Sequence, residues 1–425
     1  MKTIKLSFIR FWLLLPAVSM PLLMQAQKLS FRQADSLLVM HSHDLRSARL
    51  DVVAAEGQLA QSRRYDNPTV SMMYNVRNPN NRRWFDAGRD GELDVQVSQS
   101  FAIGGQHAEQ VRQNDALLQA SKSQLRVTGR DLLTQAHTTL VDLYYQQRQA
   151  EVYDLEIASA EKILAAYKEQ SAKGNIAEME TQRIATMLYQ LRKSRADLLI
   201  GAEGLQSQLR LLLGLNNTMP VTADIDEAVA LDEASRLYLS LQGDQQMAFD
   251  TLPELRLLNS QADAARHALK WQRSQALPQL ALQGEYDKNG SIGHNFYAVG
   301  LSIAVPLWNS NRGNIRSAQA AVEQAAIAVD RQRLALTQQR QADLATVGQY
   351  LRQLGQSSTL DADLSTMLQA AEQQFMNRHI SLVEFVDLYA NYRDTMLARL
   401  DAKSQALQAA ERLKGVWGGG LEARE

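Results

Sequence analysis

The amino-acid sequence predicts a mainly α-helical protein with a small β part, in which pairs of strands alternate with long helical hairpins. Three observations lead to this prediction. Glycine and proline are scarce, at 22 and 8 of the 425 residues, which favours long uninterrupted helices. Four short segments alternate apolar and polar residues with a period of two, as β-strands do. The order of these patterns in the first half of the chain returns in the second half.

The first 26 residues are typical of a secretory signal peptide. Lys2, Lys5 and Arg10 precede an apolar run from Phe11 to Met24, and Ala26 is a small residue suited to cleavage. The run is short for a membrane-spanning helix, which needs about 20 apolar residues. We therefore expect an exported protein; an uncleaved membrane anchor is the alternative.

A shift of 210 residues, from Leu45 to Leu255, aligns the two halves of the chain. The sequence HDLR at 43–46 then matches PELR at 253–256, and Pro68 falls on Pro278. Each of these two prolines ends the helix before it, because proline disfavours a helical residue at the preceding position. The agreement in both order and spacing predicts an internal twofold repeat.

The predicted organisation has five parts. They are a signal peptide (1–26), a first repeat (29–213), an acidic linking insertion (214–252), a second repeat (253–413) and a flexible tail (414–425). Each repeat contains a helix, two strands and a long helical hairpin. The four strands are expected at 68–76, 92–103, 279–286 and 296–308.

The four strands have the pattern of a membrane-spanning β-barrel. In the first strand, Val70, Met72 and Tyr74 alternate with mostly polar neighbours, and the strand lengths approach the 9–11 residues that cross an outer membrane. The loops at 77–91 and 287–294 are very polar and are expected on the outside. Candidates for an aromatic girdle are Tyr74, Tyr286, Tyr297 and Trp308. The alternative is a soluble four-stranded sheet with one face on a core.

Four strands cannot close a barrel of useful bore, and open strand edges cannot face lipid. A membrane barrel built from this chain must therefore be shared by several copies. Two copies would give eight strands and a lumen that side chains nearly fill, whereas three would give twelve strands and a channel. These considerations favour three or more copies without fixing the number.

The predicted helices are too long for a globular core. The segments 106–172 and 314–376 contain no proline, and each is followed by a returning helix, at 177–213 and 381–413. The first returning helix carries a coiled-coil heptad that Arg195 interrupts. Its seam residues are Ile184, Leu188, Leu191, Leu198, Ala202, Leu205, Leu209 and Leu212. The remaining surface is polar, so we expect the walls of a tube with water on both sides.

The composition excludes several classes of function. The 45 Lys and Arg residues balance 46 Asp and Glu residues, so we expect no nucleic-acid partner held by a basic surface. There is no cysteine, so we expect no disulfide, no cysteine-ligated metal and no lipid anchor on a cysteine. The pairs His41/His43 and Asp361/Asp363 lack a third ligand nearby, and no catalytic motif appears. We therefore expect no enzyme, no cofactor and no metal site.

The signal peptide, the repeat, the two strand pairs and the two hairpins together resemble the TolC-type outer-membrane efflux family. The best local match is VPLWNSNRGNI at 305–315, which is similar to the strand-to-helix junction of the heavy-metal and cation efflux branch, CzcC- and CusC-like. The segment SFAIGG at 100–105 also fits the family. The resemblance implies a homotrimer whose shared 12-stranded barrel in the outer membrane of a Gram-negative bacterium continues into a coiled-coil periplasmic tunnel. It also implies two partners, a periplasmic adaptor protein and an inner-membrane RND-type transporter.

The resemblance also implies a gate. Glu384 and Asp387 share one helix face, because they are three residues apart. Acidic residues at the matching positions line the periplasmic constriction of family members, so three copies would surround the pore with six carboxylates. Such a ring attracts cations and repels anions. The alternative is a pair of solvated acids on a helix surface.

Both hairpin turns are expected to contact the adaptor or pump. The first turn contains Lys173, Gly174, Asn175 and Ile176, and glycine is a common stop signal for a helix. The second turn contains Arg378, His379, Ile380 and Ser381. Here Arg378-His379 stands where a glycine-containing turn is common in the family, so the sequence leaves the geometry of this turn open.

The function predicted from these features is a passive exit duct of a tripartite efflux system. The cargo implied by the resemblance is heavy-metal cations, with drug efflux and type I protein secretion as alternatives. A non-transport periplasmic coiled-coil protein is the competing class, and it predicts neither a pore nor a cation preference.

Overall fold

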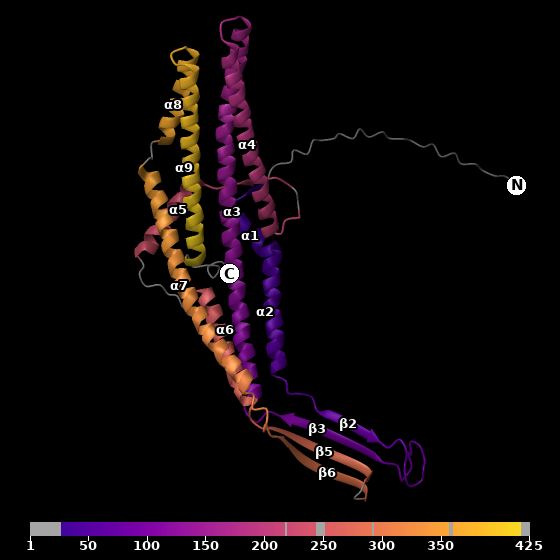
Figure 1. Cartoon of the computed structure of the whole chain (residues 1–425). Helices are drawn as coiled ribbons and strands as arrows, with labels where there is room; N and C mark the ends of the chain where they lie inside the picture. The colour runs from indigo at the N-terminus through magenta and orange to yellow at the C-terminus, as the bar shows by residue number, and fades with distance from the viewer. Residues whose placement is uncertain (1–26, 217–218, 244–250, 291–292, 357–359, 418–425) are drawn as a thin grey trace, which may run out of the picture.

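The structure is a computed structural model that describes residues 27–216, 219–243, 251–290, 293–356 and 360–417. The predicted signal peptide lies outside the described residues. The molecule is elongated: a tall stack of helices follows one axis, and a small β-sheet leaves one end of the stack at an angle (Figure 1). The turns of two helical hairpins form the opposite end (Figure 1).

Two series of elements with a similar order build this shape. The first contains α1 (Phe31–His41), α2 (His43–Ser62), β2 (Thr69–Tyr74), β3 (Leu93–Phe101), α3 (Gln106–Ala172) and α4 (Glu178–Leu212). The second contains α6 (Pro253–Ser274), β5 (Gln279–Gly290), β6 (Gly293–Ala304), α7 (Arg312–Gln356), α8 (Leu360–Met376) and α9 (Leu382–Trp417). Three short elements, β1 (Gln27–Leu29), β4 (Val221–Ala223) and α5 (Glu227–Gly243), complete the described chain.

The 67-residue helix α3 is the longest element and contacts α2, α4, α6 and α9. It spans roughly 100 Å at about 1.5 Å per residue, and it is possible because no proline interrupts it. Gly105 precedes α3 with a φ of 76°, a left-handed conformation that lets the chain turn from β3 into the helix. α3 therefore links the sheet at one end to a hairpin turn at the other.

The predicted heptad forms the seam between α3 and α4. Ile184, Leu191 and Leu209 are at most 2% exposed, and Leu188, Ala202 and Leu212 are also buried. Arg195, which interrupts the heptad, forms an ion pair with Asp154 of α3 at the edge of the seam. Most of the predicted seam is thus buried where α4 packs against α3, and Leu198 and Leu205 are half-buried.

The core of the molecule lies in the middle of the helical stack. Here β1 pairs in parallel with β4, and α5 from the acidic insertion packs against α7 and α9. Tyr238 of α5 lies so close to Gly348 of α7 that a β-carbon there would be 2.6 Å from the tyrosine hydroxyl. Lys403 of α9 also donates to Glu227 of α5 at 2.7 Å. The insertion, whose role the sequence leaves open, therefore braces α7 and α9.

The four longer strands form one antiparallel sheet in the order β2–β3–β5–β6. β3 and β5 join the two series, with Val97 opposite Gly284 and Phe101 opposite Leu280. β2 and β6 are the edges of the sheet, and each has one side without a strand partner among the described residues.

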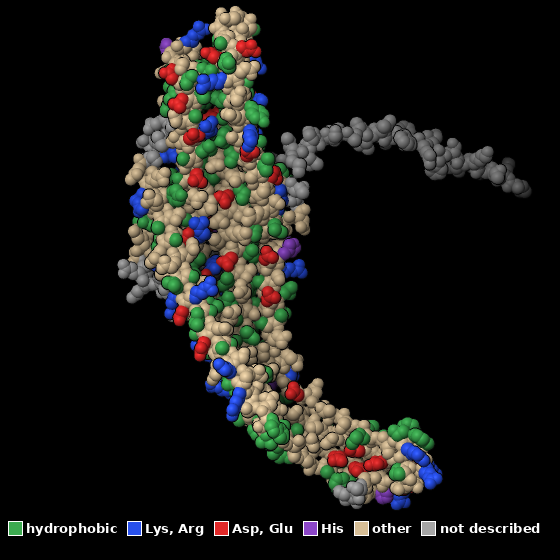
Figure 2. Space-filling view, in the orientation of Figure 1, with side chains coloured by type: hydrophobic (Ala, Val, Ile, Leu, Met, Phe, Trp, Pro, Cys, Tyr) green, Lys and Arg blue, Asp and Glu red, His purple; other side chains and the backbone are tan. Residues whose placement is uncertain are grey.

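Opposite residues of neighbouring strands share a face, so the register gives the sheet one apolar face and one polar face. The apolar face contains Val70, Met72, Tyr74, Leu93, Val95, Val97, Leu280, Leu282, Tyr286, Tyr297, Val299, Leu301 and Ile303. On the polar face, Asp94 lies opposite Asp287 and Gln96 lies opposite Glu285. Acidic side chains gather on the sheet face seen in Figure 2.

The ends of the second strand pair differ from the prediction. Asn289 pairs with His294 and Gly290 with Gly293, so the hairpin extends through most of the predicted loop at 287–294. At the other end, β6 stops at Ala304 and not at residue 308. The reason is Pro306, which has no backbone N–H for a strand ladder.

The C-terminal tail also differs from the prediction, because α9 continues through residues 414–417. The Arg340 guanidinium lies over the ring of Trp417, with 5.1 Å between the Arg340 Cζ and the ring centroid. This contact and the close approach of Gly415 to Thr134 hold the last turn against the core. Residues 418–425 lie outside the described residues. No helix in the described ranges is long and apolar enough to span a membrane.

A buried ion triad connects α1, α3 and α9. His137 of α3 is 7% exposed, and its two ring nitrogens lie 2.6 Å from Asp35 and 2.6 Å from Glu411. Burial alone would lower the pKa of His137, but hydrogen bonds and charge from the two carboxylates outweigh it and raise this pKa to about 9. The imidazolium in turn lowers the pKa of Glu411, although burial acts in the opposite direction. His137 and Glu411 are therefore both charged at neutral pH.

We expect the triad to make the stability of the protein depend on pH. A histidine pKa raised to about 9 stabilises the fold fully below its ordinary value of 6.5, and this contribution is lost as the pH rises through 9. His137→Gln should lower the free energy of unfolding by on the order of 3 kcal/mol at about pH 6, and by much less at about pH 10. Denaturant unfolding at both pH values measures the difference. The same substitution at exposed His43 is the control, and an equal effect of His137→Gln at both pH values would contradict the prediction.

Candidate functional site

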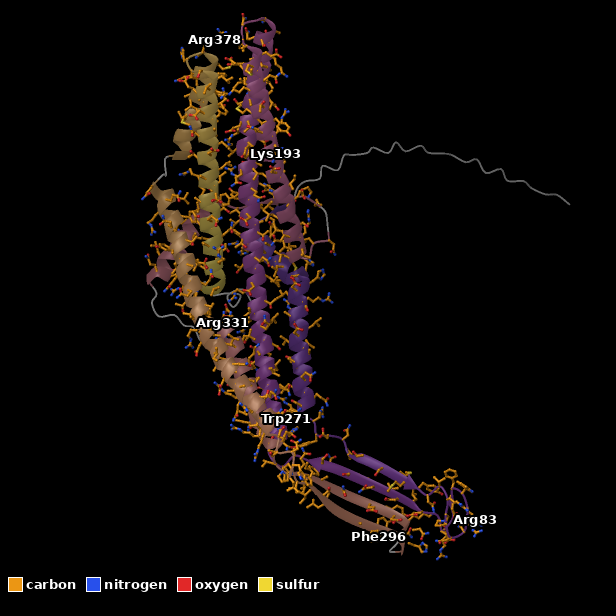
Figure 3. All side chains as sticks on the ribbon, viewed as in Figure 1. Arg83, Lys193, Trp271, Phe296, Arg331 and Arg378 are labelled. Atoms are coloured by element: carbon orange, nitrogen blue, oxygen red, sulfur yellow. The ribbon has the colours of Figure 1, made fainter. Side chains whose placement is uncertain are left out.

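The two predicted partner-contact turns lie at the same end of the molecule, the end farthest from the sheet (Figure 1). One turn connects α3 to α4, and the other connects α8 to α9. Figure 3 shows Arg378 at the tip of the second hairpin. The side chains of both turns are largely exposed, apart from half-buried Ile176 and Ile380.

The first turn is a Schellman motif, the hydrogen-bonded stop that ends many helices with a left-handed residue. The N–H of Gly174 donates to the carbonyl of Ser171 at 2.9 Å, and the N–H of Asn175 donates to that of Gln170 at 3.0 Å. Gly174 has a φ of 77°, which glycine adopts without a steric penalty. The turn is therefore stabilised by its own sequence.

The second turn has the same hydrogen bonds with a different residue at the left-handed position. The N–H of Arg378 donates to Phe375 at 3.0 Å, and the N–H of His379 donates to Gln374 at 2.8 Å. Arg378 has a φ of 61°, which costs a residue with a β-carbon about 1 kcal/mol. The departure from the glycine pattern thus leaves the turn type unchanged but adds strain at the tip.

The predicted gate residues follow this turn in the first two turns of α9. Ser381 and Glu384 form a capping box: the N–H of Ser381 donates to the Glu384 carboxylate at 2.8 Å, and the N–H of Glu384 donates to the Ser381 hydroxyl at 3.2 Å. These hydrogen bonds, chiefly the one from the Ser381 backbone, lower the pKa of Glu384. Glu384 is therefore an ionised carboxylate with a fixed position at the helix start.

Asp387 is also exposed, and its carboxylate accepts a hydrogen bond from Asn391 at 3.2 Å. The structure brings Glu384 and Asp387 together on α9, as their spacing predicts. Each carboxylate accepts a hydrogen bond from a nearby residue. Both therefore stabilise the start of α9, in addition to the gate role that the sequence predicts. Two exposed negative charges near a hairpin tip can attract cations.

Sequence reasoning missed an aromatic column beneath the tips. It consists of Tyr167 of α3, Phe375 of α8, and Phe385 and Tyr389 of α9. Successive ring centroids are 5.8, 4.4 and 4.3 Å apart. The column packs the second hairpin against the first, and aromatic pairs at these distances are favourable. The i, i+4 spacing of Phe385 and Tyr389 was the available sequence signal.

A polar cluster continues the contact between the hairpins away from the tips. The Tyr389 hydroxyl donates to Glu372 of α8 at 2.5 Å and lies 2.7 Å from the Ser159 hydroxyl of α3. Ser159 also donates to Glu372. Ser159 belongs to the first hairpin and the other two residues to the second, so separation of the hairpins would break the hydrogen bonds of Ser159.

Glu156 of α3 is the most deeply buried acid of this region, at 1% exposed. Its nearest positive group is Arg393 of α9, at 3.6 Å. Burial raises the pKa of Glu156 to about 7, although Arg393 acts to lower it. One carboxylate oxygen has no hydrogen-bond partner in the described part of the chain. The contact between α3 and α9 therefore contains a buried carboxyl group that is incompletely hydrogen-bonded at neutral pH.

The described residues contain no group of three histidine, cysteine or acidic side chains that could hold a metal ion. The arrangement of the tips instead offers two exposed turns, a pair of acids and a layer of contacts between the hairpins.

Comparison with known families decides what kind of protein this is. The family model for outer membrane efflux proteins matches residues 36–215 and 246–419, which together make up most of the chain. The chain belongs to the outer membrane efflux protein family. A search of curated proteins found no match.

Several solved membrane-protein structures share this fold at low sequence identity. The CmeC outer membrane channel of Campylobacter jejuni matches with a TM-score of 0.76 and 13% identity, over 92% of this chain and 86% of that chain. The outer membrane protein VceC of Vibrio cholerae matches with a TM-score of 0.72 and 14% identity, over 92% and 97%. CusC matches with a TM-score of 0.72 and 15% identity, over 91% of each chain. At these identities the likeness establishes the fold of this family member.

The two turns allow a test of the strain at Arg378. Gly174→Ala should lower the free energy of unfolding by about 1 kcal/mol, because no atom lies near the new methyl group and only the left-handed backbone opposes it. Arg378→Gly should raise it by up to about 1 kcal/mol. Denaturant unfolding and amide hydrogen exchange at the tips measure both changes.

The control for this pair is Gly204→Ala in the interior of α4, where there is also open space. This substitution should stabilise the helix by up to about 1 kcal/mol. A loss of stability on Arg378→Gly would contradict the assignment of strain to this residue.

Proposed function

We propose that this protein is the outer-membrane exit duct of a tripartite efflux system, a homotrimer that conducts cations passively from the periplasm to the cell exterior. The observation that carries the proposal is the exposed apolar face of the sheet. Val299 is 83% exposed, Tyr297 75% and Leu301 60%. A patch of this kind is unfavourable in water, whereas it is the expected outer surface of a barrel in lipid.

The sheet edges support a shared barrel. β2 and β6 would leave unpaired backbone groups in lipid, where each unpaired group costs several kcal/mol. Pairing β2 of one copy with β6 of the next removes both edges, and three copies give a closed barrel of twelve strands. The number three rests on the family resemblance. The polar face, with Asp94, Glu285 and Asp287, would then line a water-filled lumen.

The helices would form the periplasmic tunnel below this barrel. Apolar side chains remain exposed along the helical stack, including Leu50 at 60%, Ile200 at 71% and Ile327 at 66%. Neighbouring copies in a ring would cover such residues. The internal twofold repeat, expected from the sequence, is consistent with the two similar series of elements.

At the far end of the tunnel, the hairpin turns would contact a periplasmic adaptor and an inner-membrane RND-type transporter. The energy for transport would come from the transporter. The ring of Glu384 and Asp387 would form the cation-selective constriction at the entrance. Opening this entrance requires the hairpins to separate, which the aromatic column and the Ser159–Glu372–Tyr389 cluster oppose.

The proposed cargo is heavy-metal cations. The segment 305–315 is similar to the heavy-metal branch of the family, and the acidic gate suits cations. Drugs and secreted proteins are the alternatives within the same duct architecture. The competing class, a coiled-coil protein without a pore, does not account for the exposed apolar sheet face.

Ion conductance in a planar lipid bilayer tests both the channel and the gate. The purified protein should conduct ions with a preference for cations. Glu384→Gln with Asp387→Asn should reduce this preference several-fold, because it removes the negative charges from the entrance. Glu178→Gln with Glu180→Gln in the first turn of α4 is the matched control, since it removes two exposed carboxylates from the other hairpin. Unchanged cation selectivity in the gate variant would contradict the assignment of Glu384 and Asp387 to the gate. Absence of conductance in the wild-type protein would contradict the proposed duct function.

Growth of a deletion strain tests the cargo. If metal cations are the cargo, the strain should become sensitive to copper, silver, zinc, cobalt or nickel, and the intact gene should restore tolerance. A parallel panel of drugs and bile salts is the control for general permeability. Sensitivity to the drug panel alone would replace metals by drugs as the cargo.

A further inference from the structure

The outer loop, which we define as residues 77–91, connects β2 to β3 at the end of the sheet farthest from the helices (Figure 1). It contains four exposed basic side chains, Arg77, Arg82, Arg83 and Arg89, and two exposed aromatic ones. Figure 3 shows Arg83 at the outer tip of the loop. In Figure 2, basic and hydrophobic side chains lie next to each other at this end. The proposed duct function does not require these basic and aromatic side chains.

The outer loop is held by a buried polar centre. Asn78 and Asp86 are 2% and 5% exposed. The Asp86 carboxylate accepts hydrogen bonds from the Asn78 side chain at 3.1 Å, from the Gly88 N–H at 3.0 Å and from the Asn81 side chain. The hydrogen bonds from Asn81 and Gly88 contribute most to a lowered pKa of Asp86. The Asp86 carboxylate is therefore hydrogen-bonded inside the loop and adds no exposed negative charge to its surface.

The second strand pair anchors the same loop from outside. Lys288 donates to the carbonyls of Ala87 and Gly88 at 3.2 and 2.7 Å, and Asn289 donates to that of Asp90 at 2.9 Å. The loop is thus fixed over the end of β5, and its shape does not depend on a partner.

The backbone of the outer loop holds two aromatic side chains in exposed positions, and part of this backbone has an unfavourable conformation. Trp84 and Phe85 are 66% and 65% exposed. Phe85 and Arg82 have φ values of 49° and 60°, which are unfavourable for residues with a β-carbon. The Arg77 guanidinium lies over the Trp84 ring, with 5.8 Å between its Cζ and the ring centroid. Exposed aromatic rings beside arginines suit the boundary between lipid and water, where rings enter the interface and guanidinium groups bind phosphate in a bidentate manner.

We propose that the outer loop is a binding site for the phosphate-bearing headgroups of lipids in the outer leaflet, with arginines as the phosphate ligands and Trp84 and Phe85 as interfacial anchors. The site rests on the membrane orientation of the proposed function. Its charge is complementary to the ligand, because four arginines face outward and, of the two aspartates in the loop, one is buried within it. In the proposed orientation the loop also lies at the level of the lipid headgroups, because it follows directly after the apolar face of β2.

Lipid titration followed by native mass spectrometry tests this site. The full chain in a non-ionic detergent is titrated with diphosphoryl lipid A and separately with phosphatidylcholine. We expect preferential retention of lipid A that weakens with added salt. Arg83→Gln with Arg89→Gln should lower its affinity about 25-fold, roughly fivefold for each arginine. Arg46→Gln with Arg49→Gln on the exposed surface of α2 is the matched control and should leave the affinity unchanged.

Three results would overturn the proposal. One is equal retention of lipid A by the loop variant and the wild type. Another is a change in the number of copies per particle in the loop variant, which would make the loop a contact between copies. The third is tighter binding of a single-stranded oligonucleotide than of lipid A at the same salt concentration.

The bilayer conductance of the same variants separates this site from the duct. A conducting loop variant with weakened lipid binding supports both proposals, and a conducting protein without lipid preference removes the headgroup site alone.

Discussion

The pairing of backbone groups at the edges of the sheet is the constraint on which the rest of the structure depends. The four strands satisfy one another inside the sheet, but β2 and β6 each have an edge whose N–H and C=O groups have no strand partner in the described part of one chain. In lipid no water is present to replace that partner. In the shared barrel proposed above, neighbouring copies would pair these edges, and the same contacts would cover the exposed apolar residues on the flanks of the helices.

The long helices have little apolar surface with which to pack against one another. In the α3/α4 hairpin, a narrow seam of mostly leucine side chains holds the two helices together. Between the hairpins, the contacts are more polar: His137 lies between Asp35 and Glu411, and Glu156 faces Arg393. Burying these charges has a large desolvation cost, so removing one partner leaves the other buried without a counter-charge and destabilises the contact between the helices. The aromatic column then supplies the apolar contact nearest the tips.

Local patterns predicted most of the architecture, and contacts between distant segments explain what they missed. The length of α3 followed from the absence of proline, and the α4 seam followed from its heptad. The alternation of Val70, Met72 and Tyr74 indicated the apolar face. In contrast, no local pattern could reveal that His137 meets acids from α1 and α9, or that Tyr389 meets Ser159. The second turn was left open because glycine is the usual signal for a left-handed residue, and Arg378 adopts that conformation without it. Spacing and resemblance predict Glu384 and Asp387 as gate residues, whereas the capping role of Glu384 is visible only in its hydrogen bonds with Ser381.

The pairing of β3 with β5 has a consequence for the order of folding. β3 belongs to the first series and β5 to the second, and the whole first hairpin lies between them in the sequence. Helices and the α3/α4 seam can form from nearby residues as the chain emerges, whereas the sheet must wait for segments that are far apart to meet, which is slow. During this interval β3 can pair with β2, but its other edge, which later pairs with β5, is open, and unpaired strand edges of this kind are prone to aggregate. For a chain with this topology, shielding of the open edge of β3 until the second half arrives would limit aggregation.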